Sequence, residues 1–469
     1  MCHKYFLASI ALALLAISCS PAPASAPCAS EKFPTVAGTA LFVAASCGAD
    51  SGDGSAASPF ATIGKAAKTA GPNTTIAVAA GTYNEAVVLG AGVGLVGADR
   101  KSVTIQAPAN ASGISATGTG KITLGGFRID KATQVGLAII GAEAKVTDIE
   151  VSGTVMGQLG GEKVGGHGIQ ISDAPAAQLF NISVHDNQGV GVLATHVASV
   201  SIVDPIFIVD PIFSPRGANS KVGIVDPIFT PSVSITGNTG GGIAIVDPIF
   251  IVDPGKGDSG VKEPSLTVKS ASVSGNSQFG IALFGASATI ERSVINGTAK
   301  LNGDSADGVL VVSGGAAQKA DQLVTIAANC VIADNGRTGL TALSHADALA
   351  ATKIVLAGQV ARNAFGGAWV QGAKSQLQIV ETARISTNQL LGIAATGGAS
   401  LSVSAARIDN TVSLALIPGA GQTLISKWVM ALVCLTVPTP NSAAPNWKTM
   451  PAQGWCSASA RPKPTAALT

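Results

Sequence analysis

The spacing Asn-x-x-x-Gly, followed directly by a short alternating apolar run, recurs six times between residues 187 and 392. The pairs are Asn187–Gly191, Asn238–Gly242, Asn276–Gly280, Asn335–Gly339, Asn363–Gly367 and Asn388–Gly392. Successive glycines lie 51, 38, 59, 28 and 25 residues apart, and Gly308 falls within the longest gap. A unit of about 25 to 30 residues is too short to bury its own apolar face, so it must stack on copies of itself. The repeat therefore predicts a solenoid, which identifies an architecture but no reaction.

Short alternating apolar runs fill the chain from Ile105 to Ile408, such as Ile169-x-Ile171 and Val309-x-Val311. Alternation turns every second side chain inward, so each coil can give two or three strands to a stacked core. About ten coils at the ~4.8 Å strand spacing predict a rod on the order of 50 Å long. The expected class is an all-β, single-stranded solenoid of parallel strands.

The six asparagines are expected at the same turn of successive coils. Asparagine tolerates the left-handed conformation, and its amide can bond the coils on either side, so we predict a structural asparagine ladder. The residue before each asparagine should stack in the same register. Asp334 and Arg362 would then form an exposed ion pair worth about 0–1 kcal/mol.

The composition argues against a nucleic-acid partner and against a membrane-spanning helix. Charged residues are 12% of the chain, against roughly 25% in an average protein. A formal net charge of +2 gives no reason to expect a nucleic-acid partner. After the N-terminus no stretch has the ~18 uninterrupted apolar residues of a membrane span.

Residues 1–19 are expected to be a lipoprotein signal peptide, with Lys4 before an apolar run from Phe6 to Ile17. The run ends in Ala16-Ile17-Ser18-Cys19, which resembles a bacterial lipobox, so Cys19 is the predicted lipidation site. Ser20 after it fits delivery to the outer membrane. The alternative is an ordinary secretory signal cut near Ala24 or Ala26, although Pro27 is unfavourable directly after the second site. The expected location is the cell envelope, with a lipid anchor in the membrane.

Five further cysteines suit an oxidising compartment. Cys28 with Cys47, and Cys434 with Cys456, are the plausible disulfides, one at each end of the chain. Cys330 lies on an expected strand and is interpreted as a small buried hydrophobe. The sequence contains no Cys-x-x-Cys motif and no Cys/His cluster, so it does not predict a zinc site.

The predicted organisation is a flexible linker at 20–34, a β-helix at 35–410, and a C-terminal cap with a disordered tail at 411–469. Near the start, Ser58 is a suitable N-cap and Pro59 a suitable first residue of a short helix. Such a helix would plug the open end of a solenoid, whose first coil would otherwise expose strand edges and core.

Two motifs in this region carry a family resemblance: Pro59-Phe60-Ala61-Thr62-Ile63 and Gly81-Thr82-Tyr83-Asn84-Glu85. Over about sixty residues the segment resembles the N-terminus of bacterial parallel β-helix proteins of the pectate-lyase-like superfamily. The resemblance implies a right-handed parallel β-helix with a short N-terminal capping helix. It does not specify an activity, because both polysaccharide-degrading enzymes and uncharacterised surface proteins of this group carry such a segment.

The hexapeptide Ile-Val-Asp-Pro-Ile-Phe begins at Ile202, Ile208, Ile224 and Ile245, with a truncated copy at Ile251. Copies this similar suggest duplication of coding DNA, and we interpret 202–254 as hexapeptide insertions. Each proline removes a ladder donor and should force a bulge or an expelled loop. The alternative is an exposed apolar patch that binds a partner.

The sequence offers weak evidence for catalysis. Gly166-His167-Gly168 is the one motif shared with glycoside hydrolases resembling polygalacturonases, and without an Asp-Asp pair His167 is interpreted as a turn residue. Asp148 and Glu150 alternate with apolar residues, as on a solvated strand face. His185-Asp186 could orient an imidazole, but no nucleophile motif accompanies it.

We expect no cofactor and no metal. Calcium, the cation that lyases of this fold use, would have Asp148 with Glu150, or Asp50 with Asp53, as its best ligands, and neither pair has regular ligand spacing.

The leading functional hypothesis is a membrane-anchored, non-catalytic envelope scaffold that presents a strand face to polysaccharide or envelope protein partners. The alternative is a polysaccharide lyase or glycoside hydrolase whose site no motif reveals.

Overall fold

The computed structural model describes residues 28–204, 232–247, 264–301, 305–313, 318 and 320–409. It also describes the backbone of short strands at 415–416, 422–425, 433–435 and 455–457. The predicted signal peptide and Cys19 lie outside these residues.

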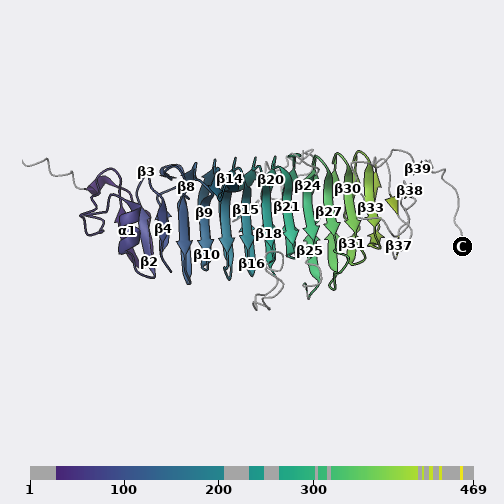
Figure 1. Cartoon of the computed structure of the whole chain (residues 1–469), viewed down its shortest axis with the longest axis horizontal. Helices are drawn as coiled ribbons and strands as arrows, with labels where there is room; N and C mark the ends of the chain where they lie inside the picture. Colours follow the sequence, from purple (N-terminus) through teal and green to yellow (C-terminus); the bar gives the residue numbers. More distant parts are fainter. Residues whose placement is uncertain are drawn as a thin grey trace, which may run out of the picture.

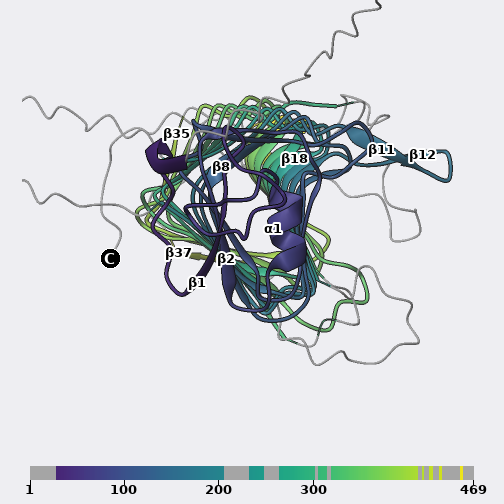
Figure 2. The same cartoon turned by 90° about the vertical axis from the view of Figure 1, so that its left-hand side faces the viewer.

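Each coil runs along three faces, and, except at the last strand of the third face, each strand pairs in parallel with its counterpart in the next coil. In one coil, β19 (Ser265–Lys269) lies on the first face, β20 (Ala271–Ser274) on the second and β21 (Gln278–Phe284) on the third. These pair with β22 (Ser287–Glu291), β23 (Val294–Asn296) and β24 (Ala306–Val312) of the following coil. Figure 1 shows the resulting rod from the side and Figure 2 shows it from its N-terminal end. The parallel β-helix predicted from the sequence is confirmed.

Every face of the rod is a ladder of short strands. The first face contains β1 (Thr39–Val43), β2 (Thr74–Val78), β5 (Gly94–Gly97), β16 (Ser199–Val203), β19 (Ser265–Lys269), β22 (Ser287–Glu291), β25 (Gln322–Ile326), β28 (Thr352–Leu356), β31 (Ser375–Ile379), β34 (Ser400–Ser404) and β37 (Gln422–Ile425). Three long strands bend from the first face onto the second: β8 (Lys121–Asp130), β10 (Glu143–Ser152) and β14 (Ala177–His185). The second face continues with β3 (Gly81–Tyr83), β6 (Val103–Gln106), β17 (Val233–Thr236), β20 (Ala271–Ser274), β23 (Val294–Asn296), β26 (Val331–Ala333), β29 (Gln359–Ala361), β32 (Arg384–Ser386) and β35 (Arg407–Asp409). The third face contains β4 (Val87–Leu89), β7 (Ile114–Thr117), β9 (Val135–Ile140), β13 (His167–Ser172), β15 (Val190–Thr195), β18 (Gly241–Val246), β21 (Gln278–Phe284), β24 (Ala306–Val312), β27 (Thr338–Leu343), β30 (Gly366–Gln371), β33 (Leu391–Thr396), β36 (Ala415–Leu416), β38 (Val433–Leu435) and β39 (Trp455–Ser457).

One continuous core runs along the inside of the coils. In β20, Ala271 and Val273 point inward and are buried, whereas Ser272 and Ser274 point outward and are half-buried. Each inward Val, Ile or Leu contributes about 1.5–3 kcal/mol by burial. The third face contains 14 strands in the described chain. At ~4.8 Å per strand the stack is roughly 60 Å long, somewhat more than the sequence suggested.

The helix α1 (Ile63–Thr69) lies at the N-terminal end of the rod (Figures 1 and 2). Its buried residues Ile63 and Ala66 belong to the same core as the strands. The carboxylate of Glu85 accepts the main-chain N–H groups of Ile63 at 2.8 Å and Gly64 at 2.7 Å. The capping helix is therefore confirmed, and Glu85 of the Gly-Thr-Tyr-x-Glu motif binds the N–H groups that begin the helix.

The predicted start of this helix at Ser58 and Pro59 is wrong. The N-cap is Thr62, whose hydroxyl accepts the N–H of Lys65. Phe60 forms a parallel bridge with Val43, which keeps the preceding residues extended. The tertiary pairing of Phe60 overrides the local capping signal of Ser58.

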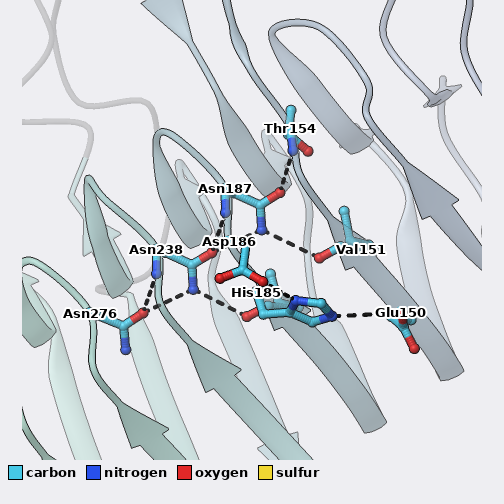
Figure 3. Close-up of polar contacts among 9 residues, drawn as sticks. Glu150, Val151, Thr154, His185, Asp186, Asn187, Asn238 and Asn276 are labelled. Atoms are coloured by element: carbon cyan, nitrogen blue, oxygen red, sulfur yellow. Dashed lines mark hydrogen bonds and ion pairs between the residues drawn. The ribbon is translucent and has the colours of Figure 1, made fainter.

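The asparagines stack in two groups of three. The main-chain N–H and side-chain Nδ2 of Asn187 both donate to Oδ1 of Asn238, at 3.2 and 2.9 Å. Asn238 donates in the same way to Asn276 (Figure 3). The second group repeats the pattern through Asn335, Asn363 and Asn388. All six side chains are buried, so each amide supplies the hydrogen bonds that a buried turn needs.

Threonine occupies the ladder position at two coils. The N–H of Thr154 donates to Oδ1 of Asn187 and that of Thr298 to Oδ1 of Asn335. The buried hydroxyls of Thr154 and Thr298 have no hydrogen-bond partner. Thr298 therefore separates the two groups of asparagines.

The left-handed residue of this turn is not the asparagine, as the sequence suggested, but the residue before it. Positive φ angles occur at Asp186, Gly237, Gly275, Asp334, Arg362 and Thr387. The asparagine itself is held by its amide bonds. Asp334 and Arg362 stack as expected and form a bidentate pair of 2.6 and 2.7 Å, with both side chains about half exposed.

The glycine of the motif makes room for the ladder. A Cβ on Gly339 would lie 2.7 Å from Nδ2 of Asn363 and 2.9 Å from the carbonyl oxygen of Gly367. Gly191 faces Asn238 in the same way, at 2.8 Å. The glycine of one coil thus faces the asparagine of the next, which explains why the two residues recur together.

Two copies of the hexapeptide begin inside the described coils. Ile202 lies near the end of β16 and Ile245 near the end of β18, and both side chains are buried in the core. Asp204 accepts hydrogen bonds from the N–H and hydroxyl of Ser232, which joins the two ends of the segment 205–231. The five prolines and the copies at Ile208, Ile224 and Ile251 lie outside the described residues.

The chain ends differ in how far they are described. Cys28, in the 3-10 turn η1 (Cys28–Ser30), is buried and forms a disulfide with Cys47, so this part of the predicted linker 20–34 is tied to the first coil. At the other end, β38 and β39 pair antiparallel with Cys434 opposite Cys456. Their side chains lie outside the described part, and that disulfide stays a prediction. Among the described residues no helix is long and apolar enough to cross a membrane.

Replacing Thr298 by asparagine should join the two groups of the ladder. Gly280 has no side chain and so leaves space beside Thr298. A Cβ on Gly280 would lie 3.5 Å from the hydroxyl of Thr298. The new amide removes an unpaired hydroxyl and adds bonds to the next coil, so Thr298→Asn should raise the free energy of unfolding by about 1–2 kcal/mol. Urea unfolding measures this change. Thr298→Val, which only removes the hydroxyl, is the control, and an equal gain in both variants would contradict the ladder explanation.

Candidate functional site

The strongest cluster of titratable side chains lies at the end of β14, beside the ladder (Figure 3). Nδ1 of His185 lies 2.8 Å from a carboxylate oxygen of Asp186, and Nε2 lies 3.7 Å from a carboxylate oxygen of Glu150. His185 and Glu150 are each 30% exposed, whereas Asp186 is 74% exposed. An imidazole between two carboxylates can hold a proton and exchange it with a bound molecule.

The backbone conformation explains why these groups meet. β10 and β14 pair so that Ser152 lies beside His185 and Glu150 beside Ser183. Asp186 then takes the left-handed conformation of the ladder turn, with a φ of 55°. Its carboxylate can therefore reach back to the imidazole of the preceding residue.

Asp148 belongs to a second, adjoining cluster. Its carboxylate lies 3.4 Å from Nε of Arg100 and accepts a hydrogen bond of 2.9 Å from the amide of Asn181. Arg100 also donates to the carbonyl oxygen of Asn181 at 3.2 Å. Asp148 and Asn181 have positive φ angles at the bend between the first and second faces.

The prediction that Asp148 and Glu150 lie on a solvated strand face is correct in their partial exposure but wrong in their regular alternation. Both side chains are about one-third exposed, but the bend at Asp148 breaks the alternation and gives the two carboxylates different partners.

His167 lies on the third face, at the start of β13. Its Nδ1 accepts the N–H of Val190 at 3.1 Å, and burial lowers the pKa of the imidazole below its usual 6.5. Gly166 before it has a φ of 78°, but His167 and Gly168 already belong to the strand, so the interpretation of His167 as a turn residue is wrong. In the described part of the chain no hydrogen bond or ion pair joins His167 to Asp148 or Glu150.

His167 also lies at the base of a hairpin that projects from the rod. The hairpin of β11 (Met156–Leu159) and β12 (Glu162–Gly165) extends away from the coils in Figure 2. The N–H of Met156 donates to the side chain of Gln188, and that of His167 to the carbonyl of Gln134, which fix the hairpin to neighbouring coils.

A surface of eight polar residues extends from Glu150 and His185 along the second face. Two outward rows in register make up this surface, which we call the polar platform: Glu150, Ser183, Ser234 and Ser272 in one row, and Ser152, His185, Thr236 and Ser274 in the other. All eight side chains are half-buried. Because the backbone pairs in register, the rows follow the rod at one residue per coil, or ~4.8 Å.

The other proposed ligand groups have structural partners. Asp50 accepts hydrogen bonds from the N–H groups of Ala61 and Thr62 and from the hydroxyl of Thr62. Asp53 accepts the N–H of Ser55, which lowers the pKa of its carboxyl. Within the described residues no three His, Cys, Asp or Glu side chains are grouped to hold a metal. Cys330 is buried and its thiol donates to the carbonyl of Ile290.

The comparisons with known proteins add little on function. A family model described as a protein of unknown function (DUF1565) matches residues 46–232, less than half of the chain. No curated protein matches.

Several solved structures resemble the chain at low identity. The A-module of the Azotobacter vinelandii mannuronan C-5 epimerase AlgE6 is 12% identical, with 77% of this chain and 93% of that one covered and a TM-score of 0.47. The catalytic domain of a GH87 α-1,3-glucanase is 13% identical, covering 78% and 67%, with a TM-score of 0.46. The periplasmic alginate epimerase AlgG is 12% identical, covering 77% and 75%, with a TM-score of 0.44. These are parallel β-helix proteins of the pectate-lyase-like kind, and likenesses this weak transfer no activity.

His167 should make the protein acid-sensitive. Its pKa is below 6.5 in the folded state, so below that pH the unfolded state binds more protons and folding stability falls as the pH falls. The loss is at most about 1.4 kcal/mol per pH unit. His167→Gln can still accept the N–H of Val190, and its thermal unfolding should be less sensitive to pH as the pH falls below about 6.5. An unchanged pH dependence would show that His167 is not the group responsible.

Proposed function

We propose that this protein is a non-catalytic glycan-binding β-helix of the bacterial cell envelope, and that the polar platform binds an extended polysaccharide. The observation that carries the proposal is the continuity of the platform. Six of its eight residues are serine or threonine, and they follow the rod over four consecutive coils. Hydroxyls both donate and accept hydrogen bonds, as the hydroxyls of a sugar chain do.

The energetics favour a long ligand. A single hydrogen bond contributes about 0.5–1.5 kcal/mol net, which does not offset the entropy lost on binding. Four coils at ~4.8 Å give a contact of roughly 14 Å along the rod, so several weak bonds can add up. The stacked backbone holds these side chains in place before the ligand arrives, which lowers the cost of binding.

The charged end of the platform favours a second candidate, a polysaccharide lyase or glycoside hydrolase. Glu150, His185 and Asp186 supply groups that can donate and accept protons next to a chain bound on the platform. Under this alternative the platform would position the substrate and His185 would transfer the proton.

The proposal includes the location of the protein in the cell. The lipobox-like sequence ending at Cys19 supports a lipid anchor, and Ser20 supports delivery to the outer membrane. The disulfide of Cys28 with Cys47 is consistent with an oxidising compartment. The proposed partners are therefore the membrane, through the anchor, and an envelope polysaccharide or protein.

Two bulky substitutions should block the platform. In the double variant Ser183→Arg with Ser234→Arg, long side chains would cover two adjacent coils, and glycan affinity should fall roughly tenfold or more. Binding is measured by affinity electrophoresis of the full chain, purified in detergent, through gels containing alginate or polygalacturonate.

The matched control places the same charge on the first face. Ser201→Arg with Thr267→Arg lies on adjacent coils there and should leave binding unchanged. Equal effects of the two pairs would contradict a platform site. The same samples are assayed for released reducing or unsaturated ends. Products from the wild type that disappear in His185→Gln would replace the binding proposal by the enzymatic one.

A further inference from the structure

A second, smaller apolar cluster lies outside the core, on the third face. Leu391 and Ala394 are buried there beneath Phe365 and Trp369. The neighbours of Trp369 in β30, Ala368 and Val370, point inward and belong to the main core. Trp369 therefore points outward from the rod, and its side chain is only partly buried.

The indole ring is held in one orientation. Its Nε1 donates to the hydroxyl of Thr396 at 3.3 Å. Phe365 stacks against it with ring centroids 5.6 Å apart and ring planes inclined by 26°. Because the polar atom of the indole already has a partner, the ring can offer an outside molecule its apolar surface.

A buried ion pair supports the aromatic pair from behind. The N–H of Phe365 donates to the carbonyl of Arg337 at 2.8 Å, and the guanidinium of Arg337 pairs with Asp307. Asp307 is fully buried and also accepts bonds from the N–H and hydroxyl of Thr338. A buried pair of this kind rarely improves stability over apolar residues, but it fixes geometry. It holds the turn from which Phe365 projects.

The surroundings select the chemistry of a ligand. The three strands at this position, β27, β30 and β33, contain no charged residue. Thr341 and Ala394 lie beside Trp369 in the adjacent coils and are both buried. Gln371 and Thr396, two residues further along the strands, are partly exposed and supply the amide and hydroxyl beside the ring. An apolar ring bordered by amide and hydroxyl groups matches a sugar ring, which has an apolar face and a rim of hydroxyls. A uronate or other anion would find no cation on these three strands.

We propose that Trp369 and Phe365 form a binding subsite for an uncharged sugar ring on the third face, separate from the polar platform. This inference rests on the proposed function, because it takes the ligand to be a glycan. It adds that the part of the glycan bound here is uncharged. Two faces of one rod would then bind glycan, so the rod could connect two chains or two segments of one chain.

The test compares Trp369→Ala with Trp369→Phe in the full chain. Affinity electrophoresis uses hydroxyethyl cellulose and galactomannan as neutral probes and alginate as the acidic probe. Trp369→Ala should weaken binding of a neutral probe roughly tenfold, and Trp369→Phe, which keeps an aromatic face, should stay within about threefold of the wild type. Val88→Ala, which changes an exposed third-face residue at the other end of the rod, should have no effect.

The outcomes separate this subsite from the polar platform. The double variant Ser183→Arg with Ser234→Arg should keep its affinity for the neutral probe. If that variant loses neutral binding and Trp369→Ala keeps it, the neutral glycan binds the platform and the subsite is refuted while the proposed function stands. A wild-type protein that binds neither neutral probe also overturns the subsite. Thermal unfolding of each variant shows whether a loss of binding comes from misfolding. If Trp369→Ala is misfolded, the affinity of Trp369→Phe for the neutral probe decides whether the subsite exists.

Discussion

The asparagine ladder is the interaction on which the regular stacking of this rod depends. At the turn between the second and third faces, the chain changes direction in a place that the next coils cover, so its N–H groups cannot reach water. Each asparagine supplies the missing acceptor, because its Oδ1 accepts both the main-chain and the side-chain N–H of the asparagine in the preceding coil. The facing glycine leaves the space that the amide fills. Where the pair occurs, a side chain in place of the glycine would clash with the amide of the next coil, and loss of that amide would leave two N–H groups of the preceding coil without their acceptor.

This constraint also builds the candidate site. The ladder fixes the register between coils, and register decides which outward side chains become neighbours. Glu150 and His185 are far apart in the chain, yet they meet because β10 and β14 are stacked through Thr154 and Asn187. The serine and threonine rows of the polar platform line up for the same reason. A repeat that serves stability thereby produces a long, regular surface, which suits a repetitive polymer more than a compact ligand.

Much of the fold could be predicted from the sequence, because inward residues alternate and the asparagines mark the same turn. What failed depended on partners distant in the chain. Ser58 has the sequence of a helix cap, but the pairing of Phe60 with Val43 moves the cap to Thr62. Thr154 and Thr298 take ladder positions without the asparagine that marks the others, so the coil containing Glu150 could not be aligned with that of His185. Recognising Ser152-Gly153-Thr154 as the equivalent of His185-Asp186-Asn187 would have placed them together.

Hydrogen exchange at the ladder tests the central claim most directly. The main-chain N–H groups of Asn187, Asn238, Asn335 and Asn363 lie in turns but donate to buried amides. Residue-resolved exchange should find them as slow as the amides of adjacent strand residues such as Ile235, and far slower than Gly161 at the hairpin tip. Exchange of the four asparagines at the rate of Gly161 would contradict the claim that the ladder holds the coils together.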